Sequence, residues 1–315
     1  MSQKFYLNDL MADANVDDMQ EIFEHTMKQY VQIRKESLLD IEKYIVLGDE
    51  ISNIKIGGKP LAYLIKHIED ADLKKTCFNY FCQRDNANLV DYNYQDKVIE
   101  DSVLEEILDM HFHNGKPALY TAIASINSWI LFSFPIEKEW ENSVIALDKE
   151  NKYKLPNFYG RNRYDVVERI LQDEETNEAY LVRFTHRIDN YFIEFSQVFK
   201  DDFMNLQTSE LNHMVKRLNV AYSKNLISLN KEDEYLYRHC TCTGVSNMFE
   251  LKSAHDFGIR FYLEKKDEHH LIFGGVGRKS KYKGKKQNKD MIRAHQEIVK
   301  YEKSKEENDK VSNIR

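Results

Sequence analysis

The stretch FELKSAHDFGIRFYLEK, residues Phe249–Lys265, decides the fold of the C-terminal part of this 315-residue chain. Polar and apolar residues alternate at both of its ends, which is the period of a half-buried strand. Because successive side chains of a strand point to opposite faces, one face of the second strand is predicted to hold Arg260, Tyr262 and Glu264. The other face, toward the core, is predicted to hold Ile259, Phe261 and Leu263.

The neighbouring segments extend this pattern in both directions. The aromatic run Tyr191–Phe195 predicts a short strand, and Phe199–Asn219 has the spacing of two amphipathic helices interrupted near Gln207–Ser209. Three strands are predicted at Met248–Lys252, Ile259–Glu264 and His270–Gly274, and a last helix at Asn288–Lys303. The predicted order is therefore strand, helix, helix, three strands and helix.

The length and composition indicate two globular domains. Hydrophobic residues make up 42% of the chain and charged residues 31%, which is too apolar for a disordered protein, and the length exceeds one ordinary domain. We assign residues 1–187 to a mixed α/β domain, residues 188–305 to the C-terminal domain, and residues 306–315 to a frayed tail.

Several elements are predicted in the N-terminal domain. Periodic apolar residues predict helices over Asp17–Ile45 and Leu61–Cys82, and a short helix over Val103–Met110. Strands are predicted at Trp129–Phe134, Ser143–Ala146 and Ala179–Phe184. Residues Glu150–Arg163 are expected to form a loop, and Tyr164–Gln172 a helix.

The basic residues are concentrated near the C-terminus. Residues 245–305 contain 15 Lys and Arg against 8 Asp and Glu, although the net charge of the whole chain is −7. Within Arg278–Lys289 seven of twelve residues are basic and none is acidic. A polyanion is the ligand that such a segment favours.

The apolar segments and the cysteines indicate where the protein is located and whether it binds a metal. The N-terminus has no basic segment followed by an apolar one, and no apolar run reaches the length of a membrane span, so we expect a cytoplasmic protein. Four cysteines are too few for a disulfide framework in a chain of this size. A zinc site would have to combine Cys240 and Cys242 with Cys77 and Cys82 from the other domain, and we expect no metal.

Five segments in order resemble the RelE/ParE toxin superfamily, which includes the HigB-like killer proteins. They are YFIEFSQVFKDDFMNL, SELNHMVKRLNVAYSKN, FELKSAHDFGIRFYLEK, HLIFGGVGRKSK and KDMIRAHQEIVKY, within residues 189–305. The resemblance implies an α+β domain with a small antiparallel sheet, a helical hairpin and a closing helix. Two departures are a longer, more basic stretch at Ser280–Gln287 and an extended approach to the ELK strand at Arg238–Ser246.

The resemblance implies an mRNA endoribonuclease that stops translation. In this family the 2′-OH of RNA attacks the adjacent phosphate, in some members on the ribosome, without a metal or cofactor. Such chemistry needs a base near the 2′-OH, cations around the phosphate and a proton donor for the leaving oxygen. The candidate catalytic residues in this chain are Arg260, Lys279, Arg278, Tyr262, Lys252 and His255.

Within this set Arg260 takes the family's phosphate-contacting position, and Tyr262 is placed to stack on a base. Arg278 or Lys279 takes a second cationic position. The basic segment is expected to contact the RNA backbone through Lys281, Tyr282, Lys283, Lys285, Lys286 and Lys289.

Two other functions remain open at this stage. The domain could inhibit DNA gyrase, as ParE-like proteins do, or bind RNA in a regulatory role without cutting it. The expected partners are mRNA, the ribosome and an antitoxin protein, with no membrane. The N-terminal domain matches no family known to us, and its acidity makes autoinhibition of the basic domain a further hypothesis.

Overall fold

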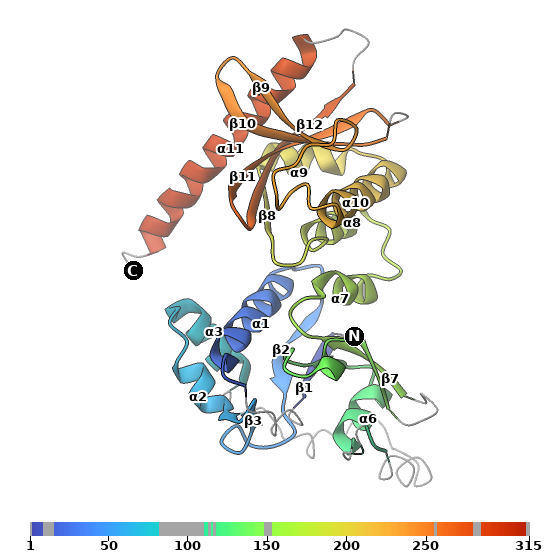
Figure 1. The fold of residues 1–315 in the computed structure, drawn as a ribbon, viewed down its shortest axis with the longest axis vertical. Coiled ribbons are helices and arrows are strands. Elements are labelled where there is room, and N and C mark those ends of the chain that lie inside the picture. Colours follow the sequence, from blue (N-terminus) through green and yellow to red (C-terminus); the bar gives the residue numbers. More distant parts are fainter. Residues whose placement is uncertain are drawn as a thin grey trace. The chain divides into compact units, whose positions relative to one another are not determined.

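The computed structural model describes residues 2–8, 16–81, 110–112, 115, 118–147, 153–254, 257–279 and 285–312. The chain divides into two compact units, Met1–Ile170 and Leu171–Arg315, each of which contains its own five-stranded sheet. Both units combine helices with a sheet, so the expected α+β class is confirmed (Figure 1).

The first unit is built on a largely parallel sheet with the order β2-β1-β5-β7-β6. Its first four strands run parallel, and the edge strand β6 is antiparallel to β7. The strands are β1 (Gln3–Leu7), β2 (Ile41–Val46), β5 (Ile130–Phe132), β6 (Val144–Leu147) and β7 (Tyr153–Phe158). Consecutive residues of β1 and β5 are buried, as in parallel sheets that are covered on both faces.

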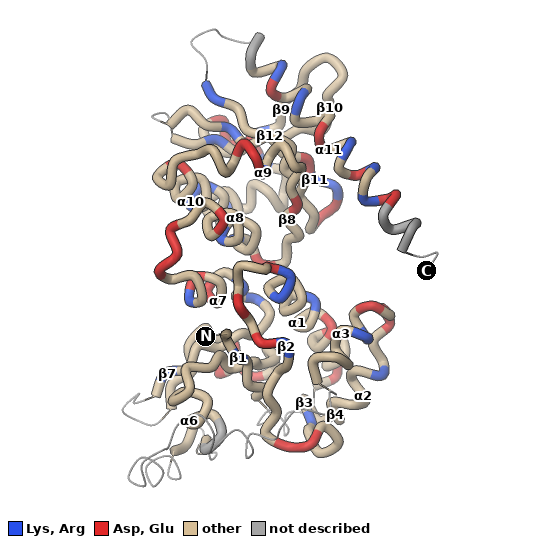
Figure 2. The backbone as a smooth tube through the Cα atoms, turned by 180° about the vertical axis from the view of Figure 1, so that it is seen from behind, with Lys and Arg blue, Asp and Glu red and all other residues tan. Residues whose placement is uncertain are grey.

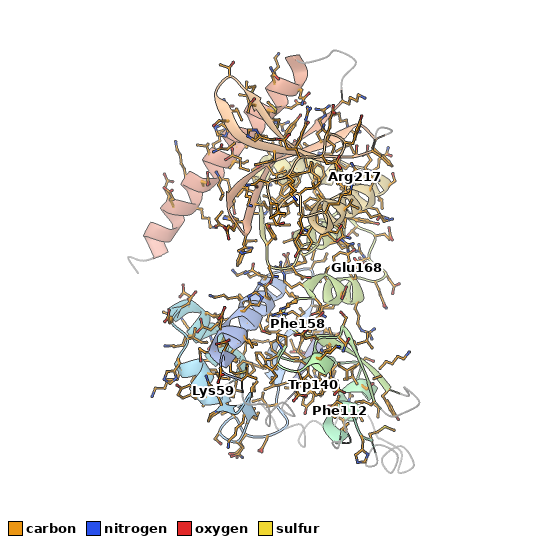
Figure 3. The ribbon with its side chains drawn as sticks, viewed as in Figure 1. Lys59, Phe112, Trp140, Phe158, Glu168 and Arg217 are labelled. Carbon is orange, nitrogen blue, oxygen red and sulfur yellow. The ribbon has the colours of Figure 1, made fainter. Side chains whose placement is uncertain are left out.

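Helices and a small hairpin complete this unit. They are α1 (Met19–Arg34), α2 (Leu61–Lys66), α3 (Ala71–Phe81), α6 (Leu119–Ile126), α7 (Arg163–Ile170), the 3-10 turn η2 (Lys138–Trp140), and the paired β3 (Lys55–Ile56) and β4 (Lys59–Pro60). Trp140 and Phe158, both labelled in Figure 3, are almost completely buried in its core.

Three elements of the first unit differ from those predicted. The helix expected to reach Ile45 ends at Arg34, because Ile41–Val46 pairs with β1 as a parallel strand. The loop expected at Glu150–Arg163 contains β7, and the helix expected over Leu61–Cys82 is divided into α2 and α3. The helix predicted to start at Val103 lies almost wholly outside the described residues.

The second unit has a sheet of order β8-β12-β11-β10-β9. Its strands are β8 (Phe192–Phe195), β9 (Tyr237–Cys242), β10 (Val245–Lys252), β11 (Ile259–Asp267) and β12 (His270–Arg278). The neighbours are antiparallel except that β8 lies parallel to β12, so the sheet is mixed and not wholly antiparallel as the resemblance implied. Strand β9 arises from the segment that extends the approach to the ELK strand.

Helices cover both faces of this sheet. Phe261 of β11 packs against Phe199, Phe203 and Phe184, which come from α9 (Gln197–Met204) and α8 (Asn177–Thr185). Helix α10 (Thr208–Ser223) contacts β10 and α8. The opposite face packs against α11 (Lys285–Ser312), on which basic and acidic positions are interspersed (Figure 2).

Glycine permits the close approach of α11. A Cβ atom on Gly274 would lie 2.3 Å from the carbonyl oxygen of Ala294, a distance at which atoms overlap. The strand β12 continues to Arg278, beyond Gly274, where the sequence predicted its end. Because Gly274 has no side chain, the backbone of α11 can pack closely against β12.

Two further elements and the domain boundary also differ from those predicted. The strand expected at Ala179–Phe184 is helix α8, and the tail expected to fray from Glu306 continues as helix to Ser312. The units divide between residues 170 and 171, whereas the sequence placed the boundary at residue 187. Helix α8 therefore belongs to the second unit.

Candidate functional site

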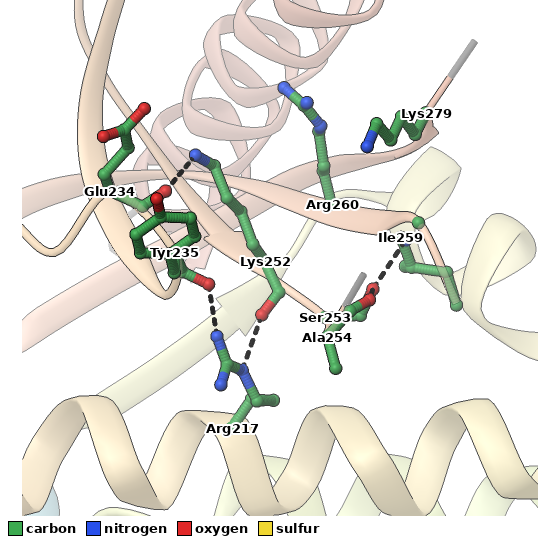
Figure 4. A pocket seen from close by; sticks show the side chains of 10 residues that line it. Arg217, Glu234, Tyr235, Lys252, Ser253, Ala254, Ile259, Arg260 and Lys279 are labelled. Carbon is green, nitrogen blue, oxygen red and sulfur yellow. Dashed lines mark hydrogen bonds between the residues drawn. The ribbon is translucent and has the colours of Figure 1, made fainter. Parts of the chain in front are cut away.

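A pocket of about 430 Å³ lies where β10, β11 and α10 meet the turn that precedes β9 (Figure 4). Four basic side chains line it, and one acidic side chain accompanies them. The basic residues are Arg217, Lys252, Arg260 and Lys279, and the acidic one is Glu234. The pocket therefore carries a surplus of positive charge, which favours an anionic ligand.

Strand register places two of these cations side by side. Lys252 of β10 is the direct cross-strand partner of Arg260 of β11. Side chains at such positions share a face and lie within about 5.5 Å of each other at Cβ, so like charges there repel. A negative charge close to both side chains offsets this repulsion.

Glu250 supplies that compensation. Its side chain is fully buried, and its carboxylate lies 2.6 Å from Nε of Arg238, 3.2 Å from Nζ of Lys252 and 2.9 Å from Nη1 of Arg260. The side-chain amide of Gln287, on α11, also donates to it at 3.2 Å. We call these five residues the Glu250 cluster. It satisfies the buried carboxylate and fixes Lys252 and Arg260 at the pocket.

Arg217 connects the pocket to α10. Its Nε donates a hydrogen bond of 2.8 Å to the carbonyl of Lys252, and its Nη2 donates to the carbonyl of Tyr235. Lys252 itself donates from Nζ to the carbonyl of Glu234. These bonds, drawn in Figure 4, tie the turn before β9 to β10 and α10.

Burial changes the acidity of two of the cations. It lowers the pKa of Lys252, although the nearby Glu250 carboxylate acts in the opposite direction. Burial also lowers the pKa of Arg217. A lysine with a depressed pKa exists more often as the neutral amine, which accepts a proton.

The structure brings three of the sequence candidates together. Arg260, Lys252 and Lys279 all line the pocket. Arg278, the neighbour of Lys279, is held elsewhere: its guanidinium donates two hydrogen bonds of 2.7 and 3.0 Å to Glu210 of α10. Of the two adjacent cations, Lys279 is therefore the one at the pocket.

The structure contradicts the catalytic role expected for Tyr262. It shares the Arg260 face of β11, as alternation predicted, but only 1% of its surface is exposed, because it packs with Met291, Ala294 and Ile298 of α11. Burial also raises its pKa above the ordinary value. A base has no access to this ring, so Tyr262 belongs to the core.

Several predicted residues lie beyond what the structure describes. His255, Lys281, Tyr282 and Lys283 fall outside the described residues. Lys285 and Lys286 begin α11, but their side chains are not among those described. Lys289 is exposed on α11.

Sequence reasoning did not identify the residues that organise the pocket. Arg217, Tyr235, Arg238, Glu250 and Gln287 belong to this group. Alternation along FELK places Glu250 and Lys252 on one face, and this signal was available. The partners on α10, β9 and α11 had no local signal, because they meet Glu250 and the pocket only in the folded chain.

The structure describes Cys77, Cys240 and Cys242, whereas Cys82 lies outside the described residues. Cys240 is buried, its thiol faces the carbonyl of Met248 at 3.5 Å, and burial raises its pKa to about 12. Among the described residues no group of three or more His, Cys, Asp and Glu side chains is arranged to hold a metal ion. None of the described helices combines the length and apolar character that a membrane crossing requires.

Comparison with known proteins gave no relatives. No family model matches the chain, and no curated protein or solved structure matches it.

Proposed function

We propose that the unit Leu171–Arg315 is an RNA endonuclease of the RelE/ParE toxin type, which stops translation by cutting mRNA. The observation that supports this function most directly is the pocket in which Lys252, Arg260, Lys279 and Arg217 surround one volume. Arg217, Arg260 and Lys279 supply positive charge at this site, which attracts an RNA phosphate and stabilises its more highly charged transition state.

The arrangement of elements supports the same proposal. Strand β8 and helices α9 and α10 precede β10 and β11, the two paired strands that contain Lys252 and Arg260. Helix α11 closes the unit. This is the order expected of the RelE-like fold, with β9 as an additional strand. Both motif strands contribute cations to the pocket, Lys252 from one and Arg260 from the other.

Each step of the proposed reaction has a residue at the pocket. In the proposed reaction Lys252 acts in its neutral form, which burial favours over the ammonium: this amine accepts the proton of the 2′-OH, and the 2′-oxygen then attacks phosphorus. The bond from phosphorus to the 5′-oxygen breaks, and that oxygen takes a proton from the Lys279 ammonium. The products are a 2′,3′-cyclic phosphate and a 5′-hydroxyl.

Arg260 stabilises the charge that develops on the phosphate oxygens during this step. Its guanidinium is already fixed by Glu250 at 2.9 Å, so it needs little reorganisation when RNA binds. Donors that are oriented before the reaction contribute most to catalysis, and removal of one reduces kcat by about 10²- to 10³-fold.

The purified full chain, incubated with RNA with and without ribosomes, tests the proposal. We expect cleavage that leaves 5′-hydroxyl ends, detected by mapping those ends, and a loss of about 100-fold in Arg260→Ala and Lys279→Ala. Arg278→Gln is the matched control, because this neighbouring cation binds Glu210; it should leave cleavage within about fivefold of wild type, which corresponds to a barrier shift of less than about 1 kcal/mol.

Two outcomes would replace the proposal. Intact RNA in both settings, together with blocked DNA supercoiling, would identify a ParE-like gyrase inhibitor. RNA that is bound but never cut would identify a regulatory RNA-binding protein. Cleavage unaffected by Arg260→Ala and Lys279→Ala would place the active site elsewhere.

A further inference from the structure

Tyr235 is the most exposed of the described large hydrophobic side chains, with 80% of its surface open to solvent. It lies at the pocket, in the turn that precedes β9. A single exposed aromatic residue is common on protein surfaces. Tyr235 differs because the pocket's own cations hold its backbone.

Hydrogen bonds fix the turn from several directions. Arg217 donates to the carbonyl of Tyr235, and Lys252 donates to the carbonyl of Glu234. The amide of Tyr235 donates to the carboxylate of Asp233 at 3.0 Å, and Asp233 also pairs with Lys224 at 3.3 Å. The ring therefore projects from a backbone that is held in place.

The next tyrosine in the same stretch has a different role. Tyr237 is fully buried and stacks on Phe249, with ring centroids 5.1 Å apart and planes 7° from parallel. It already anchors the start of β9 to β10, so the core does not require Tyr235. Nothing in the packing of the described residues explains why an aromatic ring stands at position 235.

We propose that Tyr235 is a stacking surface for an unpaired base next to the phosphate bound at the pocket. This inference rests on the proposed function and narrows its substrate to single-stranded RNA. Removal of an aromatic side chain on which a base stacks lowers the affinity by about 5- to 150-fold. Bases in an RNA duplex are already stacked on each other and are not open to such a side chain.

Binding measurements on the full chain test this assignment. The probe is a short unstructured RNA with 2′-O-methyl groups, which prevent attack by the 2′-oxygen, used as a single strand and as a duplex with its complement. We expect Tyr235→Ala to weaken binding of the single strand about 10-fold and to leave binding of the duplex unchanged. Tyr235→Phe and Tyr235→Trp keep a ring and should bind within about twofold of wild type.

Phe192→Ala provides the control for loss of an exposed aromatic residue, because Phe192 of β8 is 41% exposed and is not part of the pocket lining. It should leave binding of both probes unchanged. Circular dichroism confirms that each variant is folded. If Tyr235→Phe binds the single strand as weakly as Tyr235→Ala, the effect belongs to the hydroxyl group and the stacking role is overturned.

The failure of this inference is distinguishable from that of the proposed function. If Arg260→Ala weakens RNA binding but Tyr235→Ala does not, the stacking surface is wrong and the RNA site stands. If Tyr235→Ala weakens single strand and duplex equally, selection of unpaired bases is wrong. If the wild-type chain binds neither probe, the stacking assignment fails, whereas the proposed function fails only if RNA also stays intact in the presence of ribosomes.

Discussion

At the scale of single residues, the candidate site depends on the buried charge of Glu250. Removal of a charge from water costs several kcal/mol, and a carboxylate in the interior is stable only when cations and hydrogen bonds surround it. Arg238, Lys252, Arg260 and Gln287 provide these contacts. The same contacts hold Lys252 and Arg260 together against their mutual repulsion, so one residue serves both stability and the geometry of the pocket.

Glu250→Gln should therefore destabilise the second unit. The substitution keeps the shape of the side chain but leaves three neighbouring cations without a counter-charge, and we expect a loss of about 3 kcal/mol together with reduced cleavage. Both tryptophans, Trp129 and Trp140, lie in the first unit. The unfolding transition seen by circular dichroism should move, whereas the one seen by tryptophan fluorescence should not.

Glu232→Gln is the control, because Glu232 is an exposed glutamate in the same unit. Such surface changes alter stability by less than about 0.5 kcal/mol. Equal stability of Glu250→Gln and Glu232→Gln would show that the buried carboxylate does not hold the cluster together.

The sequence allowed the cations of the site to be predicted better than their surroundings. Short motifs and strand alternation identified Arg260 and Lys252, because both signals are local. Alternation also placed Tyr262 on the correct face of its strand, but it could not predict that α11 covers that ring. Which of Arg278 and Lys279 faces the pocket depended on Glu210, far away in the chain.

At the scale of elements, helix α11 is held against the sheet by ion pairs as well as by apolar packing. Glu194 of β8 binds Nε2 of His270 at 2.7 Å and Nζ of Lys305 at 2.6 Å. The hydrogen bond from His270 and the contacts from Lys305 lower the pKa of Glu194 from 4.5 to about 2. Glu194 therefore stabilises the fold mainly as the charged carboxylate.

The contribution of Glu194 should depend on pH. The folded-state pKa lies below the unfolded value, so the stabilisation is present above pH 4.5 and is lost as the pH falls toward 2. We expect Glu194→Gln to be less stable than wild type near neutral pH by at most about 3 kcal/mol. The difference should shrink in acid, as measured by urea unfolding followed by circular dichroism.

Other carboxylates titrate over the same range but are present in both proteins, so the comparison isolates Glu194. A stability difference that stays constant with pH would show that the amide and the carboxylate differ only in packing.

Short elements were the least predictable from the sequence. The run AYLVRF at Ala179–Phe184 is too brief for its period to distinguish a strand from a helix. The better signal was Thr176, whose side chain accepts a hydrogen bond from the amide of Ala179 and caps α8. The loop expected at Glu150–Arg163 contains Pro156, which fits in β7 because pairing with β5 begins only at Asn157.

At the scale of the whole molecule, the boundary between the units determines which segment can fold alone. Phe184 of α8 is fully buried, with ring centroids 5.1 Å from Phe273 and 5.5 Å from Phe261. Arg183 donates hydrogen bonds to the carbonyls of Glu174 and Leu171. The core of the second unit therefore begins at residue 171 and not after residue 187.

Two segments of the chain test this boundary. We expect residues 171–315 to fold cooperatively, as followed by circular dichroism during heating. Residues 189–315 lack α8, and the loss of Phe184 alone should cost about 3–5 kcal/mol, which is a large part of the stability of an ordinary domain. Equal melting temperatures for the two segments would mean that α8 is dispensable.

The same segments test whether the first unit restrains the second. Met1–Ile170 contains 20 Lys and Arg against 29 Asp and Glu, so it is acidic, whereas the proposed RNA site is basic. If the acidic unit shields that site, residues 171–315 should slow bacterial growth more than the full chain at equal protein levels. The growth effect should disappear with Arg260→Ala in the same segment, because a general burden of expression would not depend on that arginine. Equal or weaker toxicity from a stable, folded segment would assign the first unit a role other than inhibition.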